Sequence, residues 1–500
     1  MSDTPTIDHW IDGKRWEGTG ERRSPVYDPA TGEVAAEVRL ASAADVDTAV
    51  AAARAAATDW RGASLSKRTA VLFAFREVVQ RRKGELAAMI TAQHGKVLSD
   101  AGGEVQRGLE VVEFACGIPS SLKGGYTEQA STDVDVHSIR QPVGVTVGIT
   151  PFNFPAMVPL WMCPVSIACG NAFILKPSER DPGAALLLAE MWAEAGLPDG
   201  VFSVVNGDAE AVNALLGHPG VDAASFVGST PIARHVYETA ARTGMRVQAL
   251  GGAKNHMIVL PDADLEAAAD AAVSAGYGSA GERCMAISVV VAVDPVGDEL
   301  VEAIAERTRR VVVGDGRDAD SEMGPLVTAV HRDKVRGYVD AGEAAGADIV
   351  VDGRDLAVDG RGDGFWIGPT LIDKVTTDMS VYTDEIFGPV LCVVRAGSYE
   401  EAVALVNDNA FGNGVAIFTR DGGAARRFTF EIEAGMVGVN VPIPVPMAYY
   451  SFGGWGESLF GDTHVHGAEG VHFYTRGKVV TTRWADPESR GPDLGFPTHK

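Results

Sequence analysis

Cysteine and basic residues are scarce in this chain of 500 residues. Its five cysteines are odd in number and lack any CxxC spacing, which excludes a disulfide framework and a zinc ribbon and fits a reducing cytoplasm. Lys and Arg number 43 against 67 Asp and Glu, so the formal charge is −24. That charge repels phosphate backbones and anionic lipids, so we expect neither nucleic acid nor a membrane as a partner.

Signals for export or membrane insertion are also lacking. No basic region followed by an apolar core opens the sequence, so we expect no secretory signal. Residues 141–175 carry no charge, but their five prolines would break a membrane-spanning helix, and a buried strand, loop and short helix are expected instead. With 46% hydrophobic and 22% charged residues, the composition indicates a globular protein, and its length indicates two to four domains.

Short apolar runs alternate with helical segments through most of the chain. Helical spacing is found over residues 44–60, 67–93 and 105–115, and an exposed strand pair is expected over 124–140. Strands are then predicted at 145–149, 172–175, 201–205, 224–227 and 246–250, and in a second set at 258–260, 289–293, 348–351, 390–394 and 414–418. A last strand is expected over 473–484. The alternation predicts an α/β fold with two doubly wound, parallel-stranded domains that meet near Leu250.

Cys284 is the first candidate for chemistry. It lies in GSAGERCMA, a glycine-rich loop in which Glu282 and Arg283 are expected to prevent burial and Arg283 to favour the thiolate. The alternative is an inert core cysteine, the interpretation we keep for Cys163 and Cys169.

Polar residues directly follow several predicted strands. Asn153, in TPFNFP, could donate a preorganised hydrogen bond to a developing oxyanion, or could be a turn asparagine that satisfies its own loop. Lys176 and Glu179 could bind ribose hydroxyls, or form an ordinary solvated pair. Ser229 opens a helix where a pyrophosphate would fit, although no GxGxxG is present. The HxH pair at His464 has no further ligand set, so no metal is expected.

Taken together, TPFNFP, LKPSE, FVGST, GERC and EIFGP resemble the aldehyde dehydrogenase family over residues 10–484. The resemblance implies an NAD-binding domain (1–124 and 143–250), a catalytic domain (251–445) and a small β extension of oligomerisation strands (125–142 and 470–486) in a homodimer or homotetramer. It implies Cys284 as nucleophile, with Asn153 and the Cys284 backbone N–H as oxyanion hole. The NAD-binding residues that it implies are Thr150, Phe152, Lys176, Glu179, Arg180, Gly228, Ser229, Gly251, Glu385 and Phe387. A carboxylate at Glu179 would repel a 2′-phosphate, which favours NAD over NADP.

One departure from the hydrolytic members of the family concerns the base that activates water. Those members carry Glu before Leu-Gly-Gly, where this chain has Ala249. Without a base, hydrolysis of a thioacyl enzyme should lose on the order of 10² to 10⁴-fold, so we expect CoA as co-substrate.

The stretches VQALGGAKNH, ERCMA and NVPIPVPMAYYSFGGW are similar to the CoA-acylating branch of the family. This implies oxidative decarboxylation of methylmalonate or malonate semialdehyde to propionyl-CoA or acetyl-CoA, as in valine or inositol catabolism. Arg107 and Arg283 are expected to bind the substrate carboxylate, against the alternatives of a solvated helix charge and of thiolate support. A hydrolytic aldehyde dehydrogenase and a non-catalytic dinucleotide-binding protein remain open as other functions.

Overall fold

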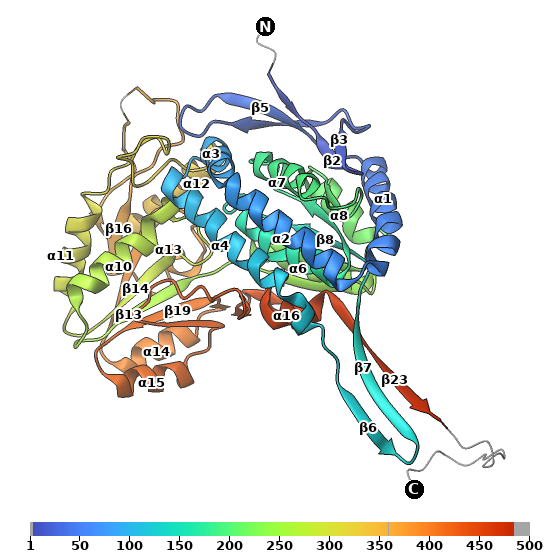
Figure 1. Cartoon of the computed structure of the whole chain (residues 1–500). Helices are drawn as coiled ribbons and strands as arrows, with labels where there is room; N and C mark the ends of the chain where they lie inside the picture. Colours follow the sequence, from blue (N-terminus) through green and yellow to red (C-terminus); the bar gives the residue numbers. More distant parts are fainter. Residues whose placement is uncertain (1–3, 359, 485–500) are drawn as a thin grey trace.

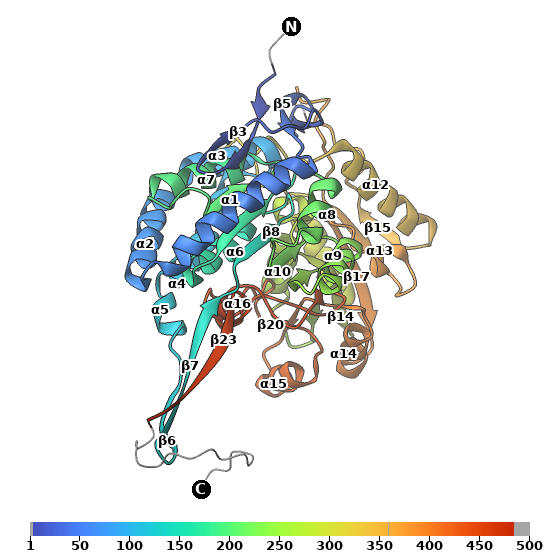
Figure 2. The same cartoon turned by 90° about the vertical axis from the view of Figure 1, so that its right-hand side faces the viewer.

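Two sheets flanked by helices make up the body of the molecule, and a three-stranded ribbon protrudes from it (Figures 1 and 2). The structure is a computed structural model that describes residues 4–358 and 360–484. Both sheets are mainly parallel, which confirms the predicted α/β class with two doubly wound units.

The first sheet has eight strands in the order β22-β12-β11-β8-β9-β10-β2-β3. Its five central strands are parallel: β8 (Val145–Ile149), β9 (Ala172–Lys176), β10 (Phe202–Val204), β11 (Ala223–Val227) and β12 (Arg246–Leu250). The edges are antiparallel and consist of β2 (His9–Ile11), β3 (Lys14–Trp16) and β22 (Leu459–Phe460). The chain builds outward from β8 in both directions, so the strand order reverses at β8, where ligands bind in open α/β sheets.

Alternating side chains on these strands pack into two separate apolar clusters, one on each face of the sheet. On one face the strands pack against α1 (Ala43–Gly62), α8 (Ala209–Gly217) and α9 (Thr230–Arg242). On the other face they pack against α2 (Leu65–Arg81), α3 (Lys83–His94), α4 (Leu98–Cys116), α6 (Met157–Cys169) and α7 (Gly183–Glu194). The single helix predicted over 67–93 is two helices, because the backbone of Arg82 leaves helical geometry.

The second sheet has seven strands in the order β15-β16-β17-β14-β13-β19-β20. They are β13 (Asn255–Val259), β14 (Ile287–Val293), β15 (Asp348–Val351), β16 (Thr370–Asp373), β17 (Val390–Ala396), β19 (Gly414–Phe418) and β20 (Met436–Val439). Its helices are α10 (Leu265–Tyr277), α11 (Gly297–Thr308), α12 (Ala329–Ala344), α14 (Tyr399–Asn407) and α15 (Gly422–Glu431). The prediction missed β16 and β20, and β15 is antiparallel because a loop, with no crossover helix, joins it to β16.

The protruding ribbon consists of β6 (Tyr126–Ser131), β7 (Val134–Pro142) and β23 (Thr475–Arg483), in the order β23-β7-β6. It confirms the predicted exposed strand pair and the last strand, while residues 485 and 486 of the expected oligomerisation segment lie outside the described residues. α16 (Gly467–Phe473) precedes β23 at the base of the ribbon. Across the described ranges, no helix is both long and apolar enough to cross a membrane.

Short elements complete the fold. They are β1 (Thr6–Ile7), β4 (Arg23–Tyr27), β5 (Val34–Arg39), α5 (Ile118–Ser121), the 3-10 turn Gly278–Gly281, α13 (Ser380–Thr383), β18 (Phe411–Gly412) and β21 (Trp455–Gly456). The turn Gly278–Gly281 leads directly into the candidate nucleophile.

Candidate active site

A cavity of about 520 Å³ lies at the carboxyl ends of β8, β9 and β11. All ten residues named above for NAD line it, together with the two candidate catalytic residues Asn153 and Cys284. They come from both sheets: Asn153 follows β8 and Lys176 ends β9 in the first, while Cys284 and Glu385 belong to loops of the second. The cavity therefore joins a dinucleotide-sized cleft to a thiol.

The features that a dinucleotide requires are present in this cavity. Lys176 Nζ lies 3.8 Å from a carboxylate oxygen of Glu179, so a donor and an acceptor for ribose hydroxyls stand together. Ser229 precedes α9 and its side chain makes no capping hydrogen bond. Pro231 has no N–H, and the N–H groups of Ile232 and Ala233 donate to the Ser229 carbonyl, so the Ser229 hydroxyl and the Thr230 N–H are the groups of this helix end that could meet a pyrophosphate. Asn213 and His235 also line the cavity and were not predicted from the sequence, because they lie inside α8 and α9 and not at strand ends.

The loop before Cys284 is held in an unusual conformation. Ser279, Ala280 and Gly281 have φ values of 54°, 52° and 71°, in the left-handed region that L side chains rarely adopt. A Cβ on Gly281 would lie 2.1 Å from the carbonyl oxygen of Gly388, so this position requires glycine. The tight backbone contact fixes the loop of Cys284 against the Glu385–Pro389 loop.

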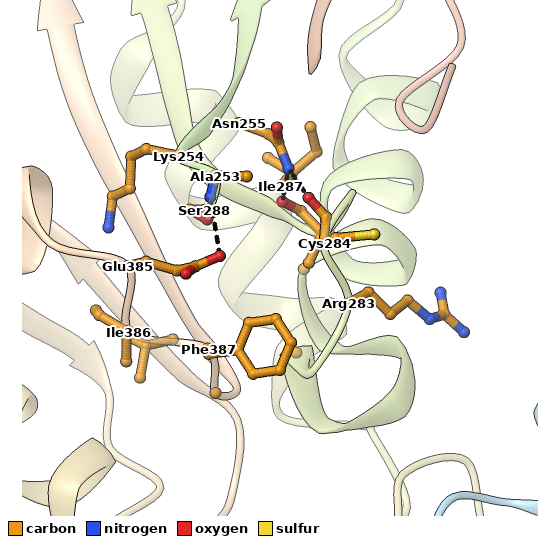
Figure 3. Close-up of a pocket in the computed structure, with 15 residues that line it drawn as sticks. Ala253, Lys254, Asn255, Arg283, Cys284, Ile287, Ser288, Glu385, Ile386 and Phe387 are labelled. Atoms are coloured by element: carbon orange, nitrogen blue, oxygen red, sulfur yellow. Dashed lines mark hydrogen bonds between the residues drawn. The ribbon is translucent and has the colours of Figure 1, made fainter. Parts of the chain in front are cut away.

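Two carboxamides hold the backbone of Cys284 itself. Asn255 Nδ2 donates to the Cys284 carbonyl at 2.8 Å and to the Ala286 carbonyl at 2.9 Å (Figure 3). Asn413 Nδ2 donates to the Cys284 carbonyl at 3.0 Å. Asn255 opens β13 and Asn413 precedes β19. No signal in the sequence connected these asparagines with a cysteine, because only the strand pairing brings them together.

The surroundings of Cys284 differ from the prediction that Arg283 favours the thiolate and that Glu282 and Arg283 prevent burial of this loop. Burial raises the pKa of Cys284 to about 12, and the nearby Glu385 adds to the rise. Arg283 lowers that pKa only slightly, because its guanidinium is paired with Asp100 at 2.6 Å. Glu282, expected to keep this loop exposed, is fully buried, and burial raises its pKa to about 8. The protein alone therefore holds Cys284 as a thiol at neutral pH.

Glu385 and Phe387 line the cavity from the loop Glu385–Pro389. The Glu385 carboxylate accepts a hydrogen bond from the Ala253 backbone N–H at 2.9 Å, and burial raises its pKa to about 7 (Figure 3). Phe387 has a φ of 61°, and its carbonyl is 2.6 Å from Nε2 of His331 on α12. His331 and Lys334 line the cavity, and the sequence analysis missed both.

The structure corrects the prediction made for Ala249. Neighbouring residues of β12 face opposite sides of the sheet. Ala249 packs with Phe226 and Ala233 in the cluster under α1, α8 and α9, whereas Leu250 belongs to the opposite cluster, against which Cys284 packs. The residue on the Cys284 side is therefore Leu250. Neither side chain can accept a proton, so the argument for an external thiol is unchanged.

The two candidate substrate arginines are placed differently. Arg283 lines the small pocket behind Cys284. Arg107 lines neither that pocket nor the large cavity; it pairs with Glu110 at 2.6 Å and donates to the Pro446 carbonyl at 2.9 Å. Asp100, the partner of Arg283, lies on α4 with Arg107, so one helix carries contacts to both arginines.

Metal ligands do not gather anywhere in the part of the chain that the structure describes, since no group of three or more His, Cys, Asp or Glu is arranged to hold an ion. His464 of the HxH pair instead contacts Ser451, whose hydroxyl lies 3.3 Å from Nδ1.

Comparisons with known proteins agree with this geometry. A model of the aldehyde dehydrogenase family matches residues 16–480. The chain is 53% identical to malonate-semialdehyde dehydrogenase of Pseudomonas aeruginosa over 495 residues, which cover 99% of both chains, and 48% identical to malonate-semialdehyde dehydrogenase 1 of Geobacillus thermodenitrificans, over 96% of this chain and 99% of that one. Among solved structures, it superposes on a putative methylmalonate-semialdehyde dehydrogenase of Sinorhizobium meliloti complexed with NAD, with a TM-score of 0.96, 53% identity and coverage of 97% and 99%. The methylmalonate-semialdehyde dehydrogenase of Oceanimonas doudoroffii gives a TM-score of 0.96 and 51% identity, with coverage of 97% and 100%.

Proposed function

The chain belongs to the aldehyde dehydrogenase family, and from that premise we propose that it catalyses the NAD- and CoA-dependent oxidative decarboxylation of methylmalonate or malonate semialdehyde. The products are propionyl-CoA or acetyl-CoA, CO₂ and NADH. The observation that carries the proposal is the single cavity in which the Cys284 thiol, the Asn153 carboxamide and the dinucleotide-binding residues meet, with an apolar residue on the Cys284 side of β12.

In the first half of the reaction, the Cys284 thiol releases its proton to solvent water and its sulfur adds to the aldehyde carbon. The Asn153 carboxamide, which no described residue engages in a hydrogen bond, donates to the resulting oxyanion together with the Cys284 backbone N–H. NAD, when bound, would supply the hydride acceptor, and Glu385 is among the cavity residues that would hold it. Loss of the hydride leaves a thioester on Cys284.

In the second half, the thioester carbonyl lies β to the free carboxylate of the substrate. The bond to the carboxylate breaks, CO₂ leaves, and the electron pair forms an enolate that then takes up a proton. The thiolate of CoA attacks the thioester and releases Cys284. Water competes poorly because Leu250 cannot act as a base. We assign Arg283 and Arg107 to the carboxylate of the bound substrate. Arg283 pairs with Asp100 and Arg107 with Glu110 in the structure, so each arginine would exchange that carboxylate for the one of the substrate.

Domain and assembly assignments follow from the same proposal. We assign residues 1–124 and 143–250 to NAD binding, 251–445 to catalysis, and 125–142 and 470–486 to oligomerisation. The protruding ribbon supports a homodimer or homotetramer, because it exposes Tyr126 (64%), Val479 (69%) and Trp484 (80%) away from any core. All five cysteines are free thiols, as expected in the cytoplasm, and the substrates suggest valine or inositol catabolism.

The decisive experiment is a CoA-dependence assay with methylmalonate semialdehyde, malonate semialdehyde and propanal. We expect a burst of NADH without CoA, slow turnover after it, and rapid steady-state formation of the acyl-CoA when CoA is added. Rapid turnover to a free acid without CoA would identify a hydrolytic enzyme. Absence of any NADH burst with all three aldehydes would favour a non-catalytic protein.

A further inference from the structure

A charged pair lies fully buried behind the candidate oxyanion hole. Lys96 follows α3 and Glu104 lies on α4; both side chains are 0% exposed, and Nζ and Oε2 are 2.8 Å apart. Removing two charges from water is costly unless further hydrogen bonds satisfy them. The further hydrogen bonds of these two groups therefore show which part of the structure the pair holds in place.

Both members of the pair hold the loop that carries Asn153. Lys96 Nζ donates to the Asn153 backbone carbonyl at 2.6 Å and lies 4.3 Å from the centre of the Phe154 ring. Glu104 Oε1 accepts hydrogen bonds from the backbone N–H groups of Ala156 at 2.9 Å and Met157 at 3.1 Å. The buried charges thus bind the loop backbone at Asn153 and on its C-terminal side, while the Asn153 carboxamide makes no hydrogen bond to a described residue.

The backbone at Lys96 is in turn fixed by loops that extend from the second sheet. The Leu98 N–H donates to the Gly316 carbonyl at 3.0 Å, and a Cβ on Gly324 would lie 2.0 Å from the Gly95 carbonyl oxygen. The same segment continues to Val327, whose N–H donates to the Glu282 carboxylate at 3.4 Å, two residues before Cys284. Lys96 is therefore placed by loops that also contact the loop of the nucleophile.

We propose that Lys96 is a positioning residue for the oxyanion hole: held by Glu104, it fixes the Asn153 loop so that the Asn153 carboxamide faces the Cys284 thiol. The inference rests on the proposed function, which assigns the oxyanion hole to Asn153 and the nucleophile to Cys284. Lys96 does not line the cavity, so it acts through Asn153 and does not touch the substrate.

Two probes of the thiol separate this role from a general structural one. Attack on p-nitrophenyl acetate creates an oxyanion, whereas alkylation by iodoacetamide at a saturated carbon does not. Neither probe needs NAD, CoA or a semialdehyde, so an error in the proposed substrate would leave the test intact. Loss of both reactions in Cys284→Ala shows that they report on this thiol; a wild-type ester burst that survives Cys284→Ala would instead overturn the nucleophile assignment and the inference with it.

Lys96→Met should slow the p-nitrophenolate burst at least tenfold, since removal of one oxyanion donor costs about 10² to 10³-fold. Its iodoacetamide rate should change less than about twofold, because the thiol itself is untouched. In an Asn153→Ala background, Lys96→Met should cause no further loss of ester reactivity, because the group through which it acts is gone.

Lys254→Met is the matched control, since Lys254 is also buried and also donates to backbone carbonyls, those of Val381 in α13 and of Asp384 directly after it, both at 2.7 Å. Its effect on the ester reaction should multiply that of Asn153→Ala. Glu104→Gln is the second variant, should Lys96→Met not fold, and should give the same selective loss. Equal slowing of both probes by the folded variants, or a Lys96→Met loss that persists in full without Asn153, would overturn the proposal.

Discussion

Replacing Leu250 by Glu should convert the second half of the reaction to hydrolysis. Leu250 ends β12 on the side of Cys284, and the next residue, Gly251, lines the cavity together with Cys284. A carboxylate there would supply the base that the chain lacks. Ala249→Glu introduces the same group one residue away, on the opposite face of the sheet, and is the matched control.

The size of the gain follows from the surroundings. A positioned general base contributes about 10² to 10⁴-fold. Burial raises the pKa of Glu282 to about 8 and that of Glu385 to about 7, so a carboxyl at residue 250 should be raised similarly. Because a raised pKa leaves only part of this carboxyl ionised at pH 7, the gain at pH 7 should lie below that range and should increase between pH 7 and pH 9.

The assay is steady-state NADH formation from propanal without CoA, with the free acid measured as product. Leu250→Glu should show this turnover, while Leu250→Gln, which lacks the base, and Ala249→Glu should not. A gain in Ala249→Glu alone would return the base position to Ala249. An equal gain in Leu250→Gln would show that side-chain polarity, and not proton transfer, admits water, and would refute the reasoning.

Three further predictions concern the site. Cys284→Ala should abolish the NADH burst and leave NAD binding, measured by calorimetry, unchanged. Cys163→Ala, in the core, should retain the burst and lower only the melting temperature. A persisting burst in Cys284→Ala would contradict the nucleophile assignment. Arg283→Leu and Arg107→Leu should each raise the KM for methylmalonate semialdehyde tenfold or more, since a charged hydrogen bond is worth about 1.5 to 3 kcal/mol, with little change for propanal; equal losses on both substrates would assign them to structure. Burial raises the pKa of Glu282 to about 8 in the folded protein, so the unfolded chain releases this proton first and the free energy of unfolding falls as pH rises from about 4.5 to about 8. Glu282→Gln should remove a few kcal/mol of that penalty at pH 9 and little at pH 4, measured by urea unfolding. An unchanged pH dependence of the free energy of unfolding would argue against a buried neutral carboxyl.

Local sequence was sufficient for the α/β class and for a few residues of the cavity lining. Apolar runs of strand length alternate with helices, and in a parallel sheet the residues after such strands gather at one edge. This is why Asn153, Lys176 and Ser229 could be named from their places after strands. The predictions of Cys284, Glu385, NAD and CoA came from the resemblance of ordered motifs to a family, since no single motif is specific.

Only the tertiary structure showed which side of a sheet each side chain faces and which residues far apart in the sequence come into contact. A period of two shows that Ala249 and Leu250 face opposite ways, but only the packed helices show which of them faces Cys284. The burial of Glu282 depends on segments distant in the sequence, because a charged residue is buried only where the fold encloses it. Lys96 reads as an ordinary loop lysine until α4 brings Glu104 to it and β8 brings Asn153. Such contacts join residues many positions apart, so the periodicity of one segment carries no information about them.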